Sequence, residues 1–135
     1  MRQALWVGIT SNSSSWSPYR ILNTGNTLEW EAVIPGVGTV NQTANDPTFD
    51  FSGNTSNGPI SITVTSSDGF TGLTELDFWN DNGVGSEITL INVDEATSLT
   101  NLSTRYNRLT SIDVTNNTLL TTLNVRGNNQ LSSGV

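Results

Sequence analysis

The sequence predicts an all-β protein whose two halves are built in different ways. Residues 1–72 contain short alternations of apolar and polar side chains, separated by glycine, proline and asparagine turns, and no long helical periodicity. Residues 73–135 instead contain an apolar pattern that recurs along the chain. We therefore expect a β-sandwich-like attachment or capping domain over residues 1–72. A β-solenoid segment of about two and a half turns is expected over residues 73–135, continuing past Val135.

The first half is expected to form six strands. Alternation is clearest where Ile60, Ile62 and Val64 fall on one face of an extended segment. The serine-rich residues 11–17 are expected to form a flexible loop. The expected strands cover residues 3–9, 19–22, 27–34, 38–43, 48–51 and 60–66. The tryptophans expected to anchor the core or an interface are Trp6, Trp16 and Trp30.

A repeated unit begins at Leu73, Leu99 and Leu120, with intervals of 26 and 21 residues. The longer first interval places an insertion around residues 83–86. One turn of such a chain cannot bury its own apolar face, so the core forms only when turns stack. The stacked positions expected on one side are Leu73, Leu76, Phe78, Leu99, Leu102, Leu120, Leu123 and Val125. Those expected on the other side are Ile88, Ile91, Val93, Leu109, Ile112 and Val114.

This unit resembles the leucine-rich repeat, whose Leu-x-x-Leu-x-Leu-x-x-Asn-x-Leu pattern recurs roughly every 20–29 residues. The asparagine- and threonine-rich form seen over residues 73–131 is similar to a subtype found in surface proteins of Bacteroidetes and in virion proteins of phages of that phylum. Two positions depart from the pattern. Thr104 replaces an inward apolar residue, and an extra residue separates Asn128 from Leu131.

The ninth position of each unit carries a short polar side chain, and Asn117 takes the same place in a half-unit. A side-chain amide at this position bonds backbone groups inside the turn that no strand ladder reaches. We therefore expect a structural ladder, rather than a ligand site, at Asp81, Asn107, Asn117 and Asn128.

The outward positions of the repeat indicate a binding patch for a sugar or a protein. Side chains that alternate with the buried leucines face solvent on one side of the sheet. Tryptophan and arginine are also enriched at binding hot spots. The candidate patch comprises Trp79, Arg105, Tyr106 and Arg126. The alternative is an ordinary surface, on which Trp79 packs against the insertion.

The composition excludes several kinds of chemistry. The chain has no lysine, histidine or cysteine, and its five arginines and twelve acidic residues give a net charge of −7. Disulfides, Cys/His zinc sites, thiol nucleophiles and imidazole bases are therefore excluded, and nucleic acid is not an expected partner.

Two further candidate sites in the sequence are weak. The acid pairs Glu29/Glu31 and Glu75/Asp77 have no other sign of a catalytic cleft around them. The oxygen-rich residues 77–83 fail the spacing of an EF-hand calcium loop because Phe78 stands at a ligand position. We expect no metal, no cofactor and no enzymatic activity.

The resemblance to the repeat subtype of phage virion proteins, with the missing secretory signal and a composition suited to an extracellular surface, implies a non-enzymatic virion protein of a bacteriophage, the particle-proximal part of a fibre, spike or decoration protein on the virion surface. No apolar segment approaches the about 18 residues that span a bilayer, and the N-terminal residues lack the apolar region of a secretory signal. The expected partners are other virion proteins, further copies of the chain in an oligomer such as a trimer, and a host surface glycan or protein. The alternative is an extracellular adhesin on a bacterial outer surface, binding protein or glycan.

Overall fold

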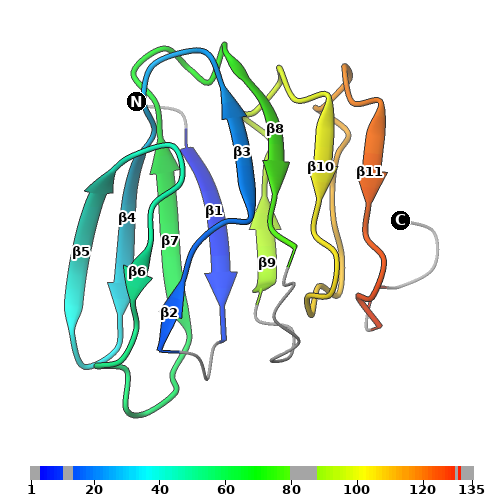
Figure 1. Ribbon diagram of the computed structural model, residues 1–135. Coiled ribbons are helices and arrows are strands. Elements are labelled where there is room, and N and C mark those ends of the chain that lie inside the picture. Colours follow the sequence, from blue (N-terminus) through cyan, green and yellow to red (C-terminus); the bar gives the residue numbers. More distant parts are fainter. Residues whose placement is uncertain (1–3, 11–13, 80–87, 130, 132–135) are drawn as a thin grey trace.

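Strands and turns make up the part of the chain that the structure describes. This computed structural model describes residues 4–10, 14–79, 88–129 and 131. Within these residues eleven strands form three sheets and no helix is present, so none is long and apolar enough to cross a membrane. The chain is all-β here, as the sequence predicts. In Figure 1 the two larger sheets overlap as two layers in the middle of the molecule and extend from there to opposite sides.

One layer is a five-stranded antiparallel sheet. Alternation predicted from the sequence is confirmed in its central strand, where Ile60, Ile62 and Val64 are buried. Val7 of the neighbouring strand is opposite Ile62 and is also buried, so this face of the sheet is apolar. In spatial order the strands are β5 (Gly38–Thr43), β4 (Glu29–Ile34), β7 (Ile60–Thr65), β1 (Ala4–Ile9) and β9 (Ile88–Asn92).

The other layer is a four-stranded sheet of mixed direction. In spatial order its strands are β11 (Thr122–Asn124), β10 (Asn101–Ser103), β8 (Leu73–Asp77) and β3 (Arg20–Asn23). The first three are parallel to one another, and β3 is antiparallel to β8. The register places Leu76, Leu102 and Leu123 side by side, which are the positions that the sequence intervals of 26 and 21 residues relate.

A third, two-stranded sheet joins β2 (Ser15–Trp16) to β6 (Phe49–Asp50). It carries aromatic side chains into the core. The ring centroid of Trp16 lies 6.3 Å from that of Trp30 and 6.1 Å from that of Phe78. Phe49 continues the cluster, 6.4 Å from Trp30. These rings connect segments that are more than sixty residues apart in the sequence, from Trp16 to Phe78.

Both larger sheets contain strands from before and after residue 72. In one, β1 pairs with β9, and in the other, β3 pairs with β8. The buried apolar residues form one cluster that extends from Leu5 to Leu109. Strands that pair with one another after residue 72 do so in parallel, but β8 and β9 also pair antiparallel with strands from before it, and the core is continuous across this residue.

Burial of the stacked leucines falls toward β11. Leu76 and Leu102 are 1% and 0% exposed, whereas Leu123 is 38% exposed. The expectation that Leu123 is buried in the stack is therefore wrong for the described chain. The reason is geometric: β11 is the last strand of its sheet, so no further strand among the described residues covers its outer edge.

Two expectations for the first half also need correction. Residues 15 and 16 form β2 instead of belonging to a flexible loop, because Trp16 is buried against the aromatic cluster. For Trp6 the core alternative is wrong, because its side chain is 42% exposed on the outer face of the five-stranded sheet, whereas Trp16 and Trp30 are buried; the interface alternative stays a prediction. The bounds of the six expected strands otherwise differ from the observed ones by at most two residues.

Candidate functional site

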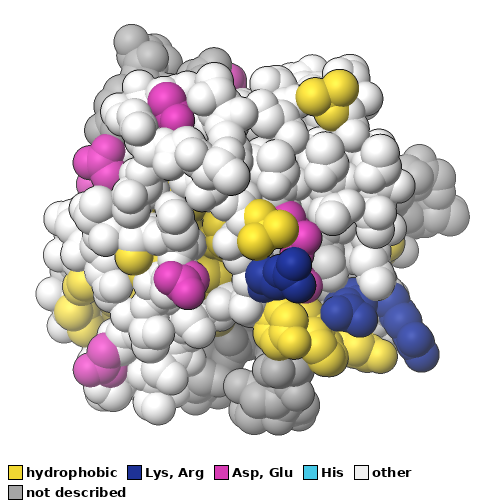
Figure 2. All heavy atoms as spheres, turned by 45° about the horizontal axis from the view of Figure 1, so that its top comes forward, with side chains coloured by type: hydrophobic (Ala, Val, Ile, Leu, Met, Phe, Trp, Pro, Cys, Tyr) yellow, Lys and Arg dark blue, Asp and Glu magenta, His cyan; other side chains and the backbone are white. Residues whose placement is uncertain are grey.

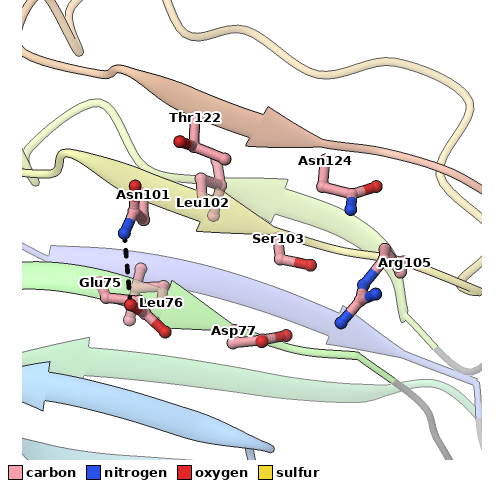
Figure 3. A pocket seen from close by; sticks show the side chains of 9 residues that line it. All are labelled: Glu75, Leu76, Asp77, Asn101, Leu102, Ser103, Arg105, Thr122 and Asn124. Carbon is pink, nitrogen blue, oxygen red and sulfur yellow. Dashed lines mark hydrogen bonds between the residues drawn. The ribbon is translucent and has the colours of Figure 1, made fainter.

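A groove of about 230 Å³ lies on the outer face of the four-stranded sheet. It crosses the parallel strands β8, β10 and β11, whose outward side chains alternate with the stacked leucines. We call it the outer groove. It is lined by Glu75, Leu76, Asp77, Asn101, Leu102, Ser103, Arg105, Thr122 and Asn124 (Figure 3).

The two carboxylates of the outer groove already have partners. The Oε2 atom of Glu75 lies 3.3 Å from Nε of Arg20, on the neighbouring strand β3. Its Oε1 atom accepts a hydrogen bond of 3.3 Å from the side-chain amide of Asn101. The Oδ1 atom of Asp77 accepts a hydrogen bond of 3.0 Å from the backbone N–H of Trp79. These contacts fix both carboxylates in the walls and floor of the groove.

An arginine and two aromatic rings stack beside the groove. Cζ of Arg105 lies 4.2 Å from the ring centroid of Trp79, which is a cation–π geometry. Tyr19 packs against Trp79 with the ring centroids 4.9 Å apart and the planes at 61°. A backbone hydrogen bond of 3.0 Å from Tyr19 N–H to the carbonyl of Asp77 holds the tyrosine there. Trp79 therefore supports the guanidinium of Arg105 from one side.

Two polar atoms at this end of the groove have no hydrogen-bond partner within the described chain. They are Nε of Arg105 and Oγ of Ser103, and both are shielded from solvent. Figure 3 shows Asp77, Ser103, Arg105 and Asn124 together at one end of the groove, while Glu75 and Asn101 lie at the other. Buried polar groups without partners are uncommon in folded proteins. Their position beside the groove makes it the strongest candidate site.

Tyr106 and Arg126 lie on the turns that follow β10 and β11. The backbone N–H of Tyr106 donates a 2.8 Å hydrogen bond to the carbonyl of Arg126. Tyr106 has a positive φ of 59°, and its ring packs so closely over Gly127 that a Cβ there would come within 2.5 Å of it. The structure thus joins Tyr106 to Arg126 and Arg105 to Trp79, but only Arg105 of these four lines the groove.

Asn107 and Asn128 are buried and bond the backbone of neighbouring coils. Oδ1 of Asn107 accepts from the N–H of Ile88 at 3.1 Å, and its Nδ2 donates to the carbonyl of Phe78 at 2.9 Å. Asn128 repeats this pattern one coil later, with its Oδ1 accepting from Leu109 N–H at 3.1 Å. Its Nδ2 donates to the carbonyl of Thr104 at 2.9 Å. Both amides join coils and face away from solvent.

Asn117 acts in the same manner on the other side of the stack. Its Nδ2 donates to the carbonyls of Val93 and Ala96 at 3.0 and 2.9 Å. Asp81, the remaining expected member of the ladder, lies outside the described residues. The insertion at residues 83–86 and most of the weak calcium candidate at residues 77–83 lie there too, apart from Asp77, Phe78 and Trp79.

The described chain does not bring metal-binding groups together. It contains no group of three or more His, Cys, Asp or Glu side chains that would hold a metal ion. The two acid pairs lie on different sheets, with Glu29 and Glu31 on β4 and Glu75 and Asp77 on β8.

The carboxyls with a clearly lowered pKa lie in or next to turns, outside the groove. The pKa of Asp50 is lowered by hydrogen bonds from the side chain and backbone of Ser52, and that of Asp113 by hydrogen bonds from the backbone and side chain of Thr115. These groups stabilise turns and are not candidates for proton transfer at the site.

Tyr19, Arg20, Ser103 and Asn124 complete this surface but were not among the residues predicted for it. Ser103 and Asn124 alternate with the buried leucines, so their outward position follows from the strand pattern. Tyr19 and Arg20 reach the site only because β3 pairs with β8 across about fifty residues of sequence. No local pattern indicates that pairing.

No family model, curated protein or solved structure matches this chain.

Proposed function

We propose that the protein is a non-enzymatic binding and display module on the surface of a bacteriophage particle, the particle-proximal part of a fibre, spike or decoration protein. The outer groove and the arginine stack beside it are its binding surface. The observation that carries this proposal is Arg105, held by Trp79 at the end of a groove where polar atoms lack partners. A rigid sheet that presents such side chains is suited to recognition.

We further propose that residues 73–131 are a leucine-rich-repeat solenoid on which this surface is built. Parallel pairing of β8, β10 and β11 at the repeated leucines supports this assignment. The buried amides of Asn107 and Asn128, which bond equivalent backbone groups one coil apart, support it as well. The preceding β-sandwich-like part closes one end of the stack through β3 and β1.

The contacts of the groove carboxylates favour binding over catalysis. Glu75 is hydrogen bonded to Asn101 and ion paired with Arg20, and Asp77 caps the backbone of Trp79. A glycosidase needs one carboxyl to protonate the leaving group and another to act as a nucleophile or base. In this groove both carboxylates are used to fix neighbouring groups.

The outer face of the five-stranded sheet is the proposed surface for attachment to other virion proteins or to further copies of the chain. Exposed apolar side chains support this role: Val33 is 48% exposed, Leu90 57% and Trp6 42%. Val33 and Leu90 share a row across the sheet through Ser61 and Gly8. This face is turned away from the outer groove, so attachment leaves the groove free.

The location is tested by fractionating an infected culture and detecting the chain with a specific antibody. Presence on purified particles is expected. Recovery only in the outer-surface fraction of uninfected cells would instead identify a bacterial adhesin and overturn the assignment to a virion.

The binding role is tested by adding the labelled protein to host cells. Trp79→Ala removes the support of Arg105 and is expected to abolish most of the cell binding. Val37→Ala is the matched control, because it removes an exposed apolar side chain from the turn between β4 and β5, outside both proposed surfaces, and it is expected to bind like the unchanged protein. Equal binding by both variants would contradict a role for the groove.

A further inference from the structure

We propose that the outer groove recognises an anionic saccharide, with Arg105 binding its carboxylate or sulfate group. This inference rests on the proposed binding function and assigns the class of its ligand. It follows from the distribution of arginine, from the way Trp79 is used, and from the balance of free donors and acceptors in the groove.

Arginines are concentrated on this face of an acidic protein. The chain has a net charge of −7 and only five arginines. Arg20 and Arg105 project from the groove and its border, and Arg126 follows β11 two residues after Asn124. Figure 2 shows arginine side chains gathered in one area next to hydrophobic side chains, with acidic side chains beside them and others scattered over the rest of this view. Arg20 is paired with Glu75, so the cation that attracts an anion to the groove is Arg105.

Trp79 serves as a support for Arg105 and not as an open stacking platform. One face of its indole ring carries the guanidinium at 4.2 Å, and Tyr19 packs on the ring at 4.9 Å. A sugar ring that stacked on Trp79 would have to displace Arg105. Stacking covers the flat face of a guanidinium but leaves its N–H edges free to form paired hydrogen bonds with a carboxylate or sulfate. The group presented to a ligand is therefore a cation held in a fixed orientation.

Hydrogen-bonding capacity that remains at this end of the groove is mostly donor capacity. Nε of Arg105 and the hydroxyl of Ser103 have no partner in the described chain. Oδ1 of Asn124 already accepts a 3.1 Å hydrogen bond from the backbone N–H of Arg126, which leaves its Nδ2 to donate. The first two are shielded from solvent, so the donors that a ligand reaches are Nδ2 of Asn124 and the outer N–H groups of Arg105. Neighbouring donors of this kind fit a ligand group that carries several acceptor oxygens.

Acidic residues in the same groove favour a saccharide over a simple anion. Glu75 and Asp77 each have one established contact or more, yet their carboxylates retain acceptor capacity. The hydroxyl groups of a sugar donate to such acceptors, whereas a small anion such as inorganic sulfate has no donor for them. A ligand with hydroxyl groups around one acidic group matches both ends of the groove.

Binding is measured by titration calorimetry with two matched pairs of saccharides. Oligogalacturonate and its methyl ester differ at the carboxylate, which esterification makes neutral, and sulfated dextran and dextran differ in the sulfate. We expect the protein to bind at least one acidic member at least about tenfold more tightly than its neutral partner, as the loss of charge-assisted hydrogen bonds implies. The pair whose acidic member binds shows whether the groove recognises a carboxylate or a sulfate.

Variants of the groove connect this preference to Arg105. Arg105→Gln is expected to weaken binding of the acidic saccharide about tenfold or more, and Arg105→Lys by less, because lysine keeps the charge but loses the planar fork. Arg108→Gln is the matched control, since Arg108 is exposed but does not line the groove; its affinity is expected to be unchanged. Ser103→Ala tests the groove without removing a charge, and all variants are compared by near-UV circular dichroism.

Several outcomes would overturn the inference. Equal affinity for acidic and neutral saccharides, or unchanged binding by folded Arg105→Gln and Ser103→Ala, would refute the anionic ligand but not the proposed binding function. Equal binding of polyglutamate would show charge attraction without recognition of a saccharide. Binding to host cells without binding to either acidic saccharide would refute only the ligand class. Failure to bind host cells as well as saccharides would refute the proposed function.

Discussion

The stack of coils has an inner boundary, between β8 and β10, and an outer one, between β10 and β11. Both use the same parallel register, with Leu76, Leu102 and Leu123 at equivalent positions. They differ in what covers them, because Leu102 is completely buried while Leu123 is 38% exposed. The comparison shows that the repeated sequence fixes which strands pair, whereas the neighbours on both sides decide how much free energy each repeat contributes.

The largest expected difference in stability is between alanine variants of two equivalent leucines, Leu102 and Leu123. Leu102→Ala is expected to lower the free energy of unfolding by about 2–5 kcal/mol, because it leaves a cavity between covered coils. Leu123→Ala is expected to cost less than about 2 kcal/mol, because its side chain is already partly hydrated. Urea unfolding followed by tryptophan fluorescence measures both. An equal loss in the two variants would mean that β11 is covered in solution, for example by another copy of the chain.

The buried amides give the next largest effect. Asn107→Ala removes an acceptor from Ile88 N–H and a donor to the carbonyl of Phe78, both within the coils. We expect a loss of about 2–3 kcal/mol, because buried backbone groups then lack partners. Asn101→Ala is the control and is expected to cost less than about 1 kcal/mol, because it removes a partly buried amide whose side-chain hydrogen bond within the described residues is to Glu75. Comparable losses would contradict a special role for the ninth position.

Thr104 is expected to give an effect of the opposite sign. It is fully buried, and its Oγ1 has no hydrogen-bond partner among the described residues. Thr104→Val keeps the shape of the side chain and removes the unsatisfied hydroxyl, so we expect a gain of about 1 kcal/mol. Thr100→Val is the control, because the Thr100 hydroxyl does donate to the carbonyl of Thr74. Thermal unfolding of both variants separates removal of an unpaired hydroxyl from the general preference of extended chain for valine. A destabilised Thr104→Val would show that the hydroxyl has a partner in solution.

Much of this architecture follows from the sequence, and the remainder has an identifiable physical reason. Alternation places Ile60, Ile62 and Val64 inward, and the repeat intervals place Leu76 beside Leu102, because both patterns are local or periodic. The buried positions of Asn107 and Asn128 follow from the same period. Pairing of β3 with β8 has no local signal, since it depends on where the whole first half folds.

Details of the candidate site depend on that non-local pairing. Trp79 and Arg105 are identifiable as outward residues of adjacent coils, and they do stack. Tyr19 becomes part of the stack only through β3, and Arg20 neutralises Glu75 by the same route. Exposure of Trp6 illustrates the converse, since composition favours burial of tryptophan but the register of β1 turns this one outward.

The smallest expected effect on stability is the difference between two turns that contain an aspartate, one in each half of the chain. Hydrogen bonds from the Ser66 hydroxyl and then from the backbone N–H of Asn26 lower the pKa of Asp68, whose ordinary value is 3.8. The bond to Asn26 joins segments 42 residues apart, whereas Asp113 bonds only Thr115 in its own turn. A local turn of that kind also forms in part of the unfolded ensemble, so its net effect on stability is smaller.

The sign of the pH dependence follows from the lowered pKa. Because the folded form holds the Asp68 carboxylate, its stabilisation is complete above the unfolded pKa of 3.8 and is lost as the pH falls toward the folded value. Asp68→Asn is therefore expected to be less stable than the unchanged protein at neutral pH, with the difference shrinking as the pH falls below 3.8. Urea midpoints measured across this range for Asp68→Asn and Asp113→Asn make the comparison. If Asp68→Asn remained less stable than the unchanged protein at low pH, the carboxylate charge would not be the cause of the difference. If Asp113→Asn lost as much stability with the same pH dependence, the hydrogen bond between distant segments would add nothing to the stability of the turn.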